Sequence, residues 1–323
     1  MKKLAITISV ILASGTAYAG NEATTQLQYA VGDTVTIEQH TSHASPDKGN
    51  DAFVYMTETL KNSTDVYQTG NNNLARVNAT NAQRSEFDIR QIGDENKGRI
   101  LTQGDLNKRN DLDIAQSGDV NRAEIYVTSS SLNTVDVSQS DRNIAAVEVS
   151  GYSDRNTVNI AQTEHNEADV NVTGYSDRNK VKIGQSRENE ADVNVTGYSD
   201  RNKVKVLQTY DNDANVTVSA FSDRNSVKVG QDFFNEANVS VYWGSDGNEI
   251  TIDQHFDNDA NVTVSGFSDG NEIGITQTAY YSDTTVKLSQ SSDNNISVWQ
   301  NSNDSAMVTG YASNNNAVTI IQN

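Results

Sequence analysis

Residues 151–197 contain two near-copies of a 23-residue unit, and few folds can accommodate such a repetition. In each copy, apolar and amide side chains alternate with mostly polar ones at a period of two, and after a short step the alternation resumes. A period of two is that of a β-strand, whose successive side chains point to opposite faces. Each unit therefore predicts two short strands. The inward side chains of the second copy are Asn179, Val181, Ile183 and Gln185 on the first strand and Asn189, Ala191, Val193 and Val195 on its partner.

The same alternation recurs along most of the chain, with thirteen first strands and twelve partner strands, starting at Asp33. Most of the glutamines that close the first strands are 23 residues apart, and the exceptions of 29, 25 and 22 residues fall in turns. A solenoid of stacked units tolerates insertions in its turns. We therefore predict an all-β fold, a two-sheet parallel β-solenoid of about twelve and a half strand-turn-strand repeats of ~23 residues, over residues 33–322.

Amide side chains at repeated positions are expected to stack on one another, because parallel rungs lie about 4.8 Å apart. Each amide has both a donor and an acceptor, so an inward column can bond upward and downward. The predicted structural glutamine ladder consists of Gln39, Gln68, Gln91, Gln116, Gln139, Gln162, Gln185, Gln208, Gln231, Gln254, Gln277, Gln300 and Gln322. The predicted asparagine ladder consists of Asn156, Asn179, Asn202, Asn225, Asn248 and Asn271. An alternative role for these asparagines is that of ordinary turn residues.

The composition fits such a fold. Only 35% of the 323 residues are hydrophobic, which is low for one large core but sufficient for a thin core shared by stacked rungs. The chain has one proline, which lies in an inserted loop at residues 40–49, outside the predicted strands. It has no cysteine, so its stability must come from hydrogen bonding and stacking rather than from disulfides.

The first 19 residues have the features of a secretory signal peptide. Two lysines precede an apolar run, and a small-residue motif ends at Ala19, so we predict cleavage between Ala19 and Gly20. The run is shorter than the roughly 20 residues of a membrane span, so we expect a secreted protein that does not span the membrane. Residues 20–32 show no clear repeat pattern and are expected to form a flexible N-terminal leader. The 43 acidic residues outnumber the 24 basic ones, which argues against nucleic acid as a partner.

The early repeats resemble a known family. The pattern Q-x-G-x-x-N-x-A that begins at Gln68 and again at Gln116 is similar to the curlin repeat, the unit of curli amyloid subunits in bacterial biofilms. The resemblance extends over nearly all of residues 33–322, although later units replace the opening serine by asparagine and lose the glycine. It implies a subunit that polymerises with itself into extracellular fibres on the surface of a Gram-negative type of bacterium, for biofilm matrix, adhesion and aggregation. It also implies a nucleator subunit and an outer-membrane export system as partners.

The outward side chains of the middle units carry opposite charges on the two predicted sheets. The first strands present Lys180, Lys182, Lys203, Lys205 and Lys228, and the partner strands present Glu167, Asp169, Glu190, Asp192, Asp213, Glu236 and Asp259. Like charges stacked along a ladder repel one another by some tenths of a kcal/mol per pair. This pattern costs stability unless cations or an oppositely charged neighbouring filament offset it.

No residues point to catalysis or to a cofactor, because no Ser-His-Asp set, phosphate loop or desolvated carboxylate pair recurs. The turns at Asp154, Asp177, Asp200 and Asp223 offer oxygen ligands for Ca²⁺, but we interpret them as a solvated acidic surface. His40 and His43 are spaced for a metal but are also typical of exposed polar residues. We therefore predict no metal site and no enzyme. The alternative to a fibre subunit is a monomeric acidic β-solenoid adhesin or a Ca²⁺- or glycan-binding surface protein.

Overall fold

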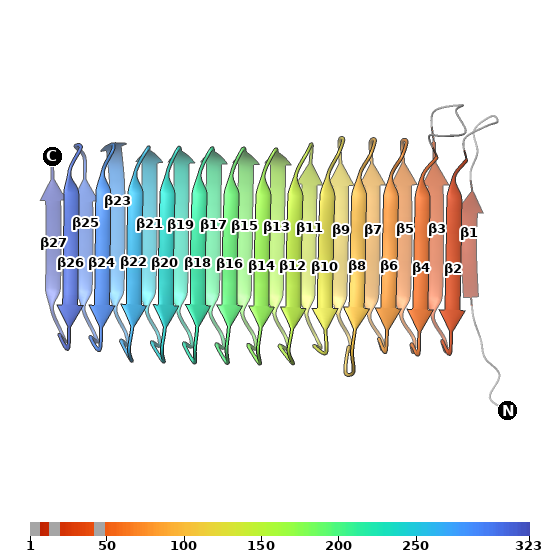
Figure 1. Cartoon of the computed structure of the whole chain (residues 1–323), viewed down its shortest axis with the longest axis horizontal. Helices are drawn as coiled ribbons and strands as arrows, with labels where there is room; N and C mark the ends of the chain where they lie inside the picture. Colours follow the sequence, from red (N-terminus) through yellow and green to blue (C-terminus); the bar gives the residue numbers. More distant parts are fainter. Residues whose placement is uncertain (1–6, 13–19, 42–48) are drawn as a thin grey trace. The chain divides into compact units, whose positions relative to one another are not determined.

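The computed structural model describes residues 7–12, 20–41 and 49–323, with residues 7–12 described as backbone only. The chain divides into two compact units, Met1–His165 and Asn166–Asn323. Every regular element in the described ranges is a β-strand. Within each unit, successive strands alternate between two sheets and point in opposite directions (Figure 1). We refer to these as the odd-strand and even-strand sheets.

In the first unit, all pairing between neighbouring strands of a sheet is parallel. The odd-strand sheet contains β1 (Thr7–Leu12), β3 (Thr34–His40), β5 (Ser63–Thr69), β7 (Glu86–Ile92), β9 (Asp111–Ser117), β11 (Thr134–Ser140) and β13 (Thr157–Glu164). The even-strand sheet contains β2 (Glu22–Gln28), β4 (Asp51–Thr57), β6 (Leu74–Thr80), β8 (Lys97–Gln103), β10 (Arg122–Thr128) and β12 (Ile144–Ser150).

The second unit repeats this arrangement. Its odd-strand sheet contains β15 (Lys180–Arg187), β17 (Lys203–Tyr210), β19 (Ser226–Phe233), β21 (Glu249–Phe256), β23 (Glu272–Tyr280), β25 (Asn295–Gln300) and β27 (Ala317–Gln322). Its even-strand sheet contains β14 (Glu167–Thr173), β16 (Glu190–Thr196), β18 (Asp213–Ser219), β20 (Glu236–Tyr242), β22 (Asp259–Ser265), β24 (Asp283–Ser289) and β26 (Ser305–Tyr311). A register shift interrupts the pairing of β21 with β23 after Gln254.

The core of each unit is a set of columns that run between the two sheets. On β15, Val181 and Ile183 are fully buried, and on β16 Ala191 and Val193 are fully buried. Residues of the same type face each other across neighbouring strands, as Val193 faces Val170 and Val216. Burying a valine or isoleucine side chain contributes about 1.5–3 kcal/mol. The prediction of an all-β, two-sheet parallel β-solenoid with a repeat of about 23 residues is confirmed.

The structure corrects the expectation of a flexible leader at residues 20–32. Residues Glu22–Gln28 form β2, which pairs in parallel with β4 so that Ala23 lies opposite Ala52 and Leu27 opposite Met56. The Oδ1 atom of Asn21 accepts a hydrogen bond of 2.9 Å from the backbone N–H of Asn50. The segment thus follows the partner-strand pattern. The sequence pattern did not reveal β2 because Thr25 replaces the central aliphatic residue. In addition, no strand ending in glutamine precedes it in the sequence.

The N-terminal segment that was interpreted as a signal peptide contains β1, whose backbone pairs with β3 so that Leu12 lies in register with Gln39. Ala19, one side of the predicted cleavage site, lies outside the described residues, and Gly20 is exposed. Cleavage between them stays a prediction. His43 and the proline of the inserted loop also lie outside the described residues.

Candidate functional site: amide ladders, strand edges and charged faces

The thirteen predicted glutamines lie at the inward position near the end of each odd-numbered strand from β3 to β27. In the first unit, each Nε2 donates to Oε1 of the glutamine on the next rung at 2.8–2.9 Å, from Gln39 to Gln162. In the second unit, the corresponding distances are 2.9–3.1 Å, from Gln185 to Gln322. Each amide nitrogen also donates to a backbone carbonyl of the even-strand sheet, as Gln208 does to Glu190 at 2.8 Å. The ladder therefore ties neighbouring rungs together and also ties the two sheets together.

The predicted asparagines begin the odd-numbered strands and are buried. In the second unit, each Nδ2 donates to Oδ1 of the asparagine on the preceding rung at 2.8–3.2 Å, from Asn202 to Asn316. The same Oδ1 atoms also accept from the backbone N–H of the following asparagine, as Asn179 does from Asn202 at 2.8 Å. These residues are therefore both ladder members and turn residues. The asparagine amides thus donate to the preceding rung, whereas the glutamine amides donate to the next rung.

A second asparagine ladder, absent from the predicted site, begins the even-numbered strands. In the first unit its amide-to-amide distances are 2.9–3.1 Å, and in the second they are 2.8–3.3 Å. Its members are Asn50, Asn73, Asn96, Asn121 and Asn143 in the first unit and Asn166, Asn189, Asn212, Asn235 and Asn258 in the second. The regular spacing of asparagines at partner-strand starts is the sequence signal from which this second ladder could have been predicted.

The acidic turns are hydrogen-bonded to the neighbouring rung rather than free to bind a ligand with both oxygens. The Oδ1 atoms of Asp200 and Asp223 accept hydrogen bonds of 2.7 Å from the backbone N–H of Asp177 and Asp200, respectively. His40 lies 2.6 Å from the Glu38 carboxylate. In the parts of the chain that the structure describes, no group of three or more His, Cys, Asp and Glu side chains is placed to hold a metal ion.

The ladders end in groups of opposite hydrogen-bonding character. Near the N-terminus, Oε1 of Gln39 is buried and has no hydrogen-bond partner among the described residues. At the other end, β27 pairs with β25 on one side only, and Nε2 of Gln322 donates to the carbonyl of Ser305 at 3.3 Å. Asn316 is exposed at the start of β27. In the first unit, Gln39 therefore carries an unmet acceptor, and in the second unit Gln322 carries an amide nitrogen with a second N–H to donate.

The outward faces of the second unit have the charges that the sequence predicts. Lysines face lysines on β15, β17 and β19, as Lys182 faces Lys205, which faces Lys228. On the even-strand sheet, acidic residues face each other from β14 to β24, as Glu190 faces Asp213. Burial, and then the charges of Glu190, Glu236 and Asp192, raises the pKa of Asp213.

In the first unit the charges of the two outward faces are exchanged, which the sequence interpretation did not notice. The odd-strand sheet is acidic and includes a ladder in which Asp65, Asp88, Asp113 and Asp136 face one another in turn. The even-strand sheet is basic, with Arg76, Lys97, Arg99 and Arg122. These cations are partly engaged within the sheet: Arg122 lies 2.9 Å from Glu124, and Arg99 lies over the ring of Tyr126.

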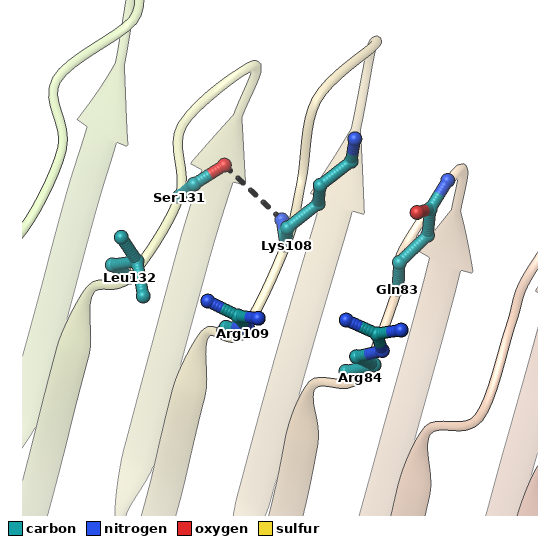
Figure 2. Close-up of a pocket in the computed structure, with 6 residues that line it drawn as sticks. All are labelled: Gln83, Arg84, Lys108, Arg109, Ser131 and Leu132. Atoms are coloured by element: carbon teal, nitrogen blue, oxygen red, sulfur yellow. Dashed lines mark hydrogen bonds between the residues drawn. The ribbon is translucent and has the colours of Figure 1, made fainter.

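The turns of the first unit also form an open basic depression of about 320 Å³. Figure 2 shows Arg84 and Arg109 at equivalent places in two neighbouring turns, with Lys108 beside them and its backbone N–H donating to the hydroxyl of Ser131 at 3.2 Å. The positive charges of Arg84, Lys108 and Arg109 attract anions without selecting among them. The depression encloses no cavity in which a substrate would be shielded from water.

The second unit exposes a row of aromatic turn residues. Tyr175, Tyr198 and Phe221 are each about half exposed or more, and their rings stack on one another with centroids 5.0 and 5.2 Å apart. Because the ring faces cover each other, mainly ring edges are presented to solvent.

Among the described residues, no helix is long and apolar enough to cross a membrane. A comparison of the sequence with known protein families found no family model that matches the chain. A comparison with curated proteins likewise found none that matches.

Proposed function

We propose that this chain is a secreted structural subunit that polymerises end to end into an extracellular, curli-like amyloid fibre. The observation that carries the proposal is the pair of ladder ends: a buried acceptor without a partner on Gln39 and an amide donor on Gln322. Joining the two ends gives this acceptor a donor and continues the glutamine ladder, and a hydrogen bond of this kind contributes about 0.5–1.5 kcal/mol. The similarity of the repeats that begin at Gln68 and Gln116 to curlin supports the same conclusion.

The strand registers are suited to this joint. Gln300 pairs with Gln322, and Gln39 pairs with Gln68, so both end strands keep the repeat register of their own sheets. Placing β27 of one subunit beside β3 of the next sets Gln322 opposite Gln39, with Ile320 opposite Ile37. The joint therefore continues the backbone ladder, the aliphatic column and the amide ladder together.

In the full chain, the edge of β3 that this joint requires is paired with β1. Removal of residues 1–19, the predicted signal peptide, frees that edge. Processing and polymerisation are thereby coupled, because a subunit gains its acceptor edge only after it has lost its N-terminal segment.

The alternative function, a monomeric acidic adhesin, draws its support from the exposed aromatic row at Tyr175, Tyr198 and Phe221. Exposed aromatic side chains recur at binding surfaces, and this function requires no joint between subunits. The two functions differ in whether chains without residues 1–19 form fibres.

The test compares the chain lacking residues 1–19 with two variants of β27. Gln322→Leu removes the terminal donor, and Thr319→Val, the matched control, changes an exposed side chain on the same strand. We expect thioflavin-positive fibres with cross-β diffraction, and elongation roughly tenfold slower for Gln322→Leu, since a tenfold change corresponds to about 1.4 kcal/mol. The control is expected to elongate at the unmodified rate. Absence of fibres, or equal rates for both variants, contradicts the proposal.

A further inference from the structure

The outward odd-strand face of the first unit is a patch of carboxylates in two ladders. Its members occupy the first and third positions of their strands and are Asp65, Glu86, Asp88, Asp111, Asp113 and Asp136. We call this set the acidic face. Glu86 lies opposite Asp111, and Asp88 lies opposite both Asp65 and Asp113. Like charges directly opposite each other in a sheet are destabilising, so the isolated unit bears an unrelieved repulsion here.

Two observations concern Asp88, which lies at the centre of the acidic face. The Oδ1 atom of Asp88 is buried and has no hydrogen-bond partner among the described residues. Burial, followed by the charges of Asp65, Glu86, Asp113 and Asp111, raises the pKa of Asp88 to about 6. An external cation or hydrogen-bond donor would stabilise the ionised form of a carboxylate in this position.

The outward odd-strand face of the second unit has the complementary composition. Its lysines are Lys180, Lys182, Lys203, Lys205 and Lys228, on β15, β17 and β19. We call this set the basic face. They too occupy the first and third positions of their strands, and Lys182, Lys205 and Lys228 form a continuous ladder. Within the described ranges, none of these lysines lies within ion-pair distance of a carboxylate.

We propose that the acidic face of one copy binds the basic face of a second copy, so that two solenoids associate side by side through their odd-strand sheets. Both faces are built on parallel strands with the same spacing, so the facing charges remain in step over several rungs. Because both sets use the first and third strand positions, they meet when the strands of the two sheets point the same way. When two sheets face each other with their strands pointing the same way, the order of rungs from the N-terminus to the C-terminus runs in opposite directions in the two copies.

This association is separate from end-to-end growth. Growth uses the edges of β3 and β27, whereas the lateral contact uses side chains that point away from the core on β5 to β11 and on β15 to β19. The lateral contact therefore does not rest on the proposed function. Between fibres, the lateral contact is expected to produce bundles. In the full chain, where β1 pairs with β3, it is expected to produce pairs of subunits.

The test uses two triple variants of the full chain. Asp65→Lys/Asp88→Lys/Asp113→Lys makes the acidic face basic, and Lys182→Glu/Lys205→Glu/Lys228→Glu makes the basic face acidic. A third variant, Glu190→Lys/Asp213→Lys/Glu236→Lys, introduces the same charge change as the first on the even-strand sheet of the second unit and serves as the control. Circular dichroism verifies that each variant keeps its β-structure.

Sedimentation velocity at low ionic strength measures the association. We expect the unmodified chain and the control to form pairs, and each of the first two variants alone to associate at least tenfold more weakly. An equimolar mixture of those two variants is expected to recover association, because each supplies the charge that the other lacks.

Failure of the mixture to associate, loss of association in the control, or no loss in either face variant overturns the inference. If small cations rather than a second copy neutralise the acidic face, Asp65→Lys/Asp88→Lys/Asp113→Lys associates to the same extent as the unmodified chain. That result also overturns the inference. Thioflavin-monitored growth of the chain lacking residues 1–19, measured separately, reports end-to-end joining, so failure of either proposal is recognised independently.

Discussion

At the scale of single residues, Asp88 illustrates how position in a ladder determines chemistry. Its cross-strand neighbours are Asp65 and Asp113, both of the same charge, and burial is the largest cause of its raised pKa. A carboxyl whose pKa is higher in the folded state than in the unfolded state binds a proton preferentially when folded. Its ionisation therefore destabilises the fold as pH rises from about 4, the ordinary value, through about 6.

Asp88→Asn is accordingly expected to raise the free energy of unfolding at pH 7 by up to about 1 kcal/mol, the size of one or two relieved like-charge pairs. The gain is expected to be much smaller at pH 4, where Asp88 is protonated in the folded state and about half protonated in the unfolded state. Denaturant unfolding at the two pH values measures the difference. The control Asp253→Asn removes a charge whose cross-strand neighbours are Gly230 and Thr276, and is expected to change stability by less than about 0.5 kcal/mol. A gain for Asp88→Asn that persists unchanged at pH 4 contradicts this account.

The inward residues were predictable one by one, because period-two alternation separates inner from outer positions without reference to neighbours. Gln208 and Asn202 are buried as expected, and both lie in hydrogen-bonded columns. The environment of an outward residue depends instead on which residues face it across the sheet. The raised pKa of Asp88 therefore became visible only once the registers of β5, β7 and β9 were known.

At the scale of elements, the turns of the early repeats depend on a backbone conformation that most residues avoid. Gly93 has a φ of 116°, and a Cβ placed there would lie 2.1 Å from the carbonyl oxygen of Gly118 on the next rung. This close approach explains the glycine of the Q-x-G motif. Where that glycine is absent, as between Gln162 and Asn166, the turn is usually one residue shorter. The residue before the asparagine has a positive φ in both kinds of turn, as Glu95 and His165 show.

We expect Gly93→Ala to lower the free energy of unfolding by more than about 1 kcal/mol, because the new methyl group meets backbone atoms that cannot rotate away. Gly274→Ala is the matched control, since the nearest atom to a Cβ at that strand position is 4.0 Å away. Chemical denaturation midpoints of the two variants measure the contrast. Equal midpoints would show that the turn relaxes to accommodate a side chain.

The strands were largely predictable as elements, but β2 was not. Asn21, Ala23 and Leu27 occupy the partner-strand positions, yet Thr25 interrupts the aliphatic pattern and five of the seven residues of β2 are polar. A single degenerate repeat has too little pattern of its own to be recognised. Pairing with β4 supplies the stabilisation that its composition lacks.

At the scale of the whole molecule, charge acts in opposite directions on the two proposed contacts. The chain has a net charge of −19, and loss of Lys2 and Lys3 with residues 1–19 makes it −21, so subunits that join end to end repel one another. Salt shortens the reach of that repulsion to about 8 Å at physiological ionic strength. The lateral contact joins opposite charges, and salt weakens it. The exchange of charge between the two units escaped the sequence interpretation because it considered only the middle repeats, where one sheet is basic and the other acidic.

Added NaCl is therefore expected to speed fibre elongation and to thin fibre bundles in the same sample. Lowering the pH from 7 toward the sequence pI of about 4.5 is also expected to speed elongation, since protonation removes negative charge. Light scattering follows growth, and electron microscopy measures bundle width, across series of NaCl and pH. If salt changes growth and width in the same sense, one of the two contacts has been assigned the wrong electrostatic sign.

The opposed directions of the amide ladders give the chain a means of distinguishing head from tail. Gln322 presents a donor at its end and Gln39 an acceptor at the other, while the asparagine column runs the reverse way, with Oδ1 of Asn316 facing outward. A copy that arrives upside down and sets its own β27 against the first β27 runs the two strands antiparallel, whereas neighbouring strands within each sheet are parallel, and it places no Gln39 acceptor opposite the Gln322 donor. Parallel pairing and the one-way glutamine ladder together make the joint directional, so a fibre built this way has two chemically distinct tips.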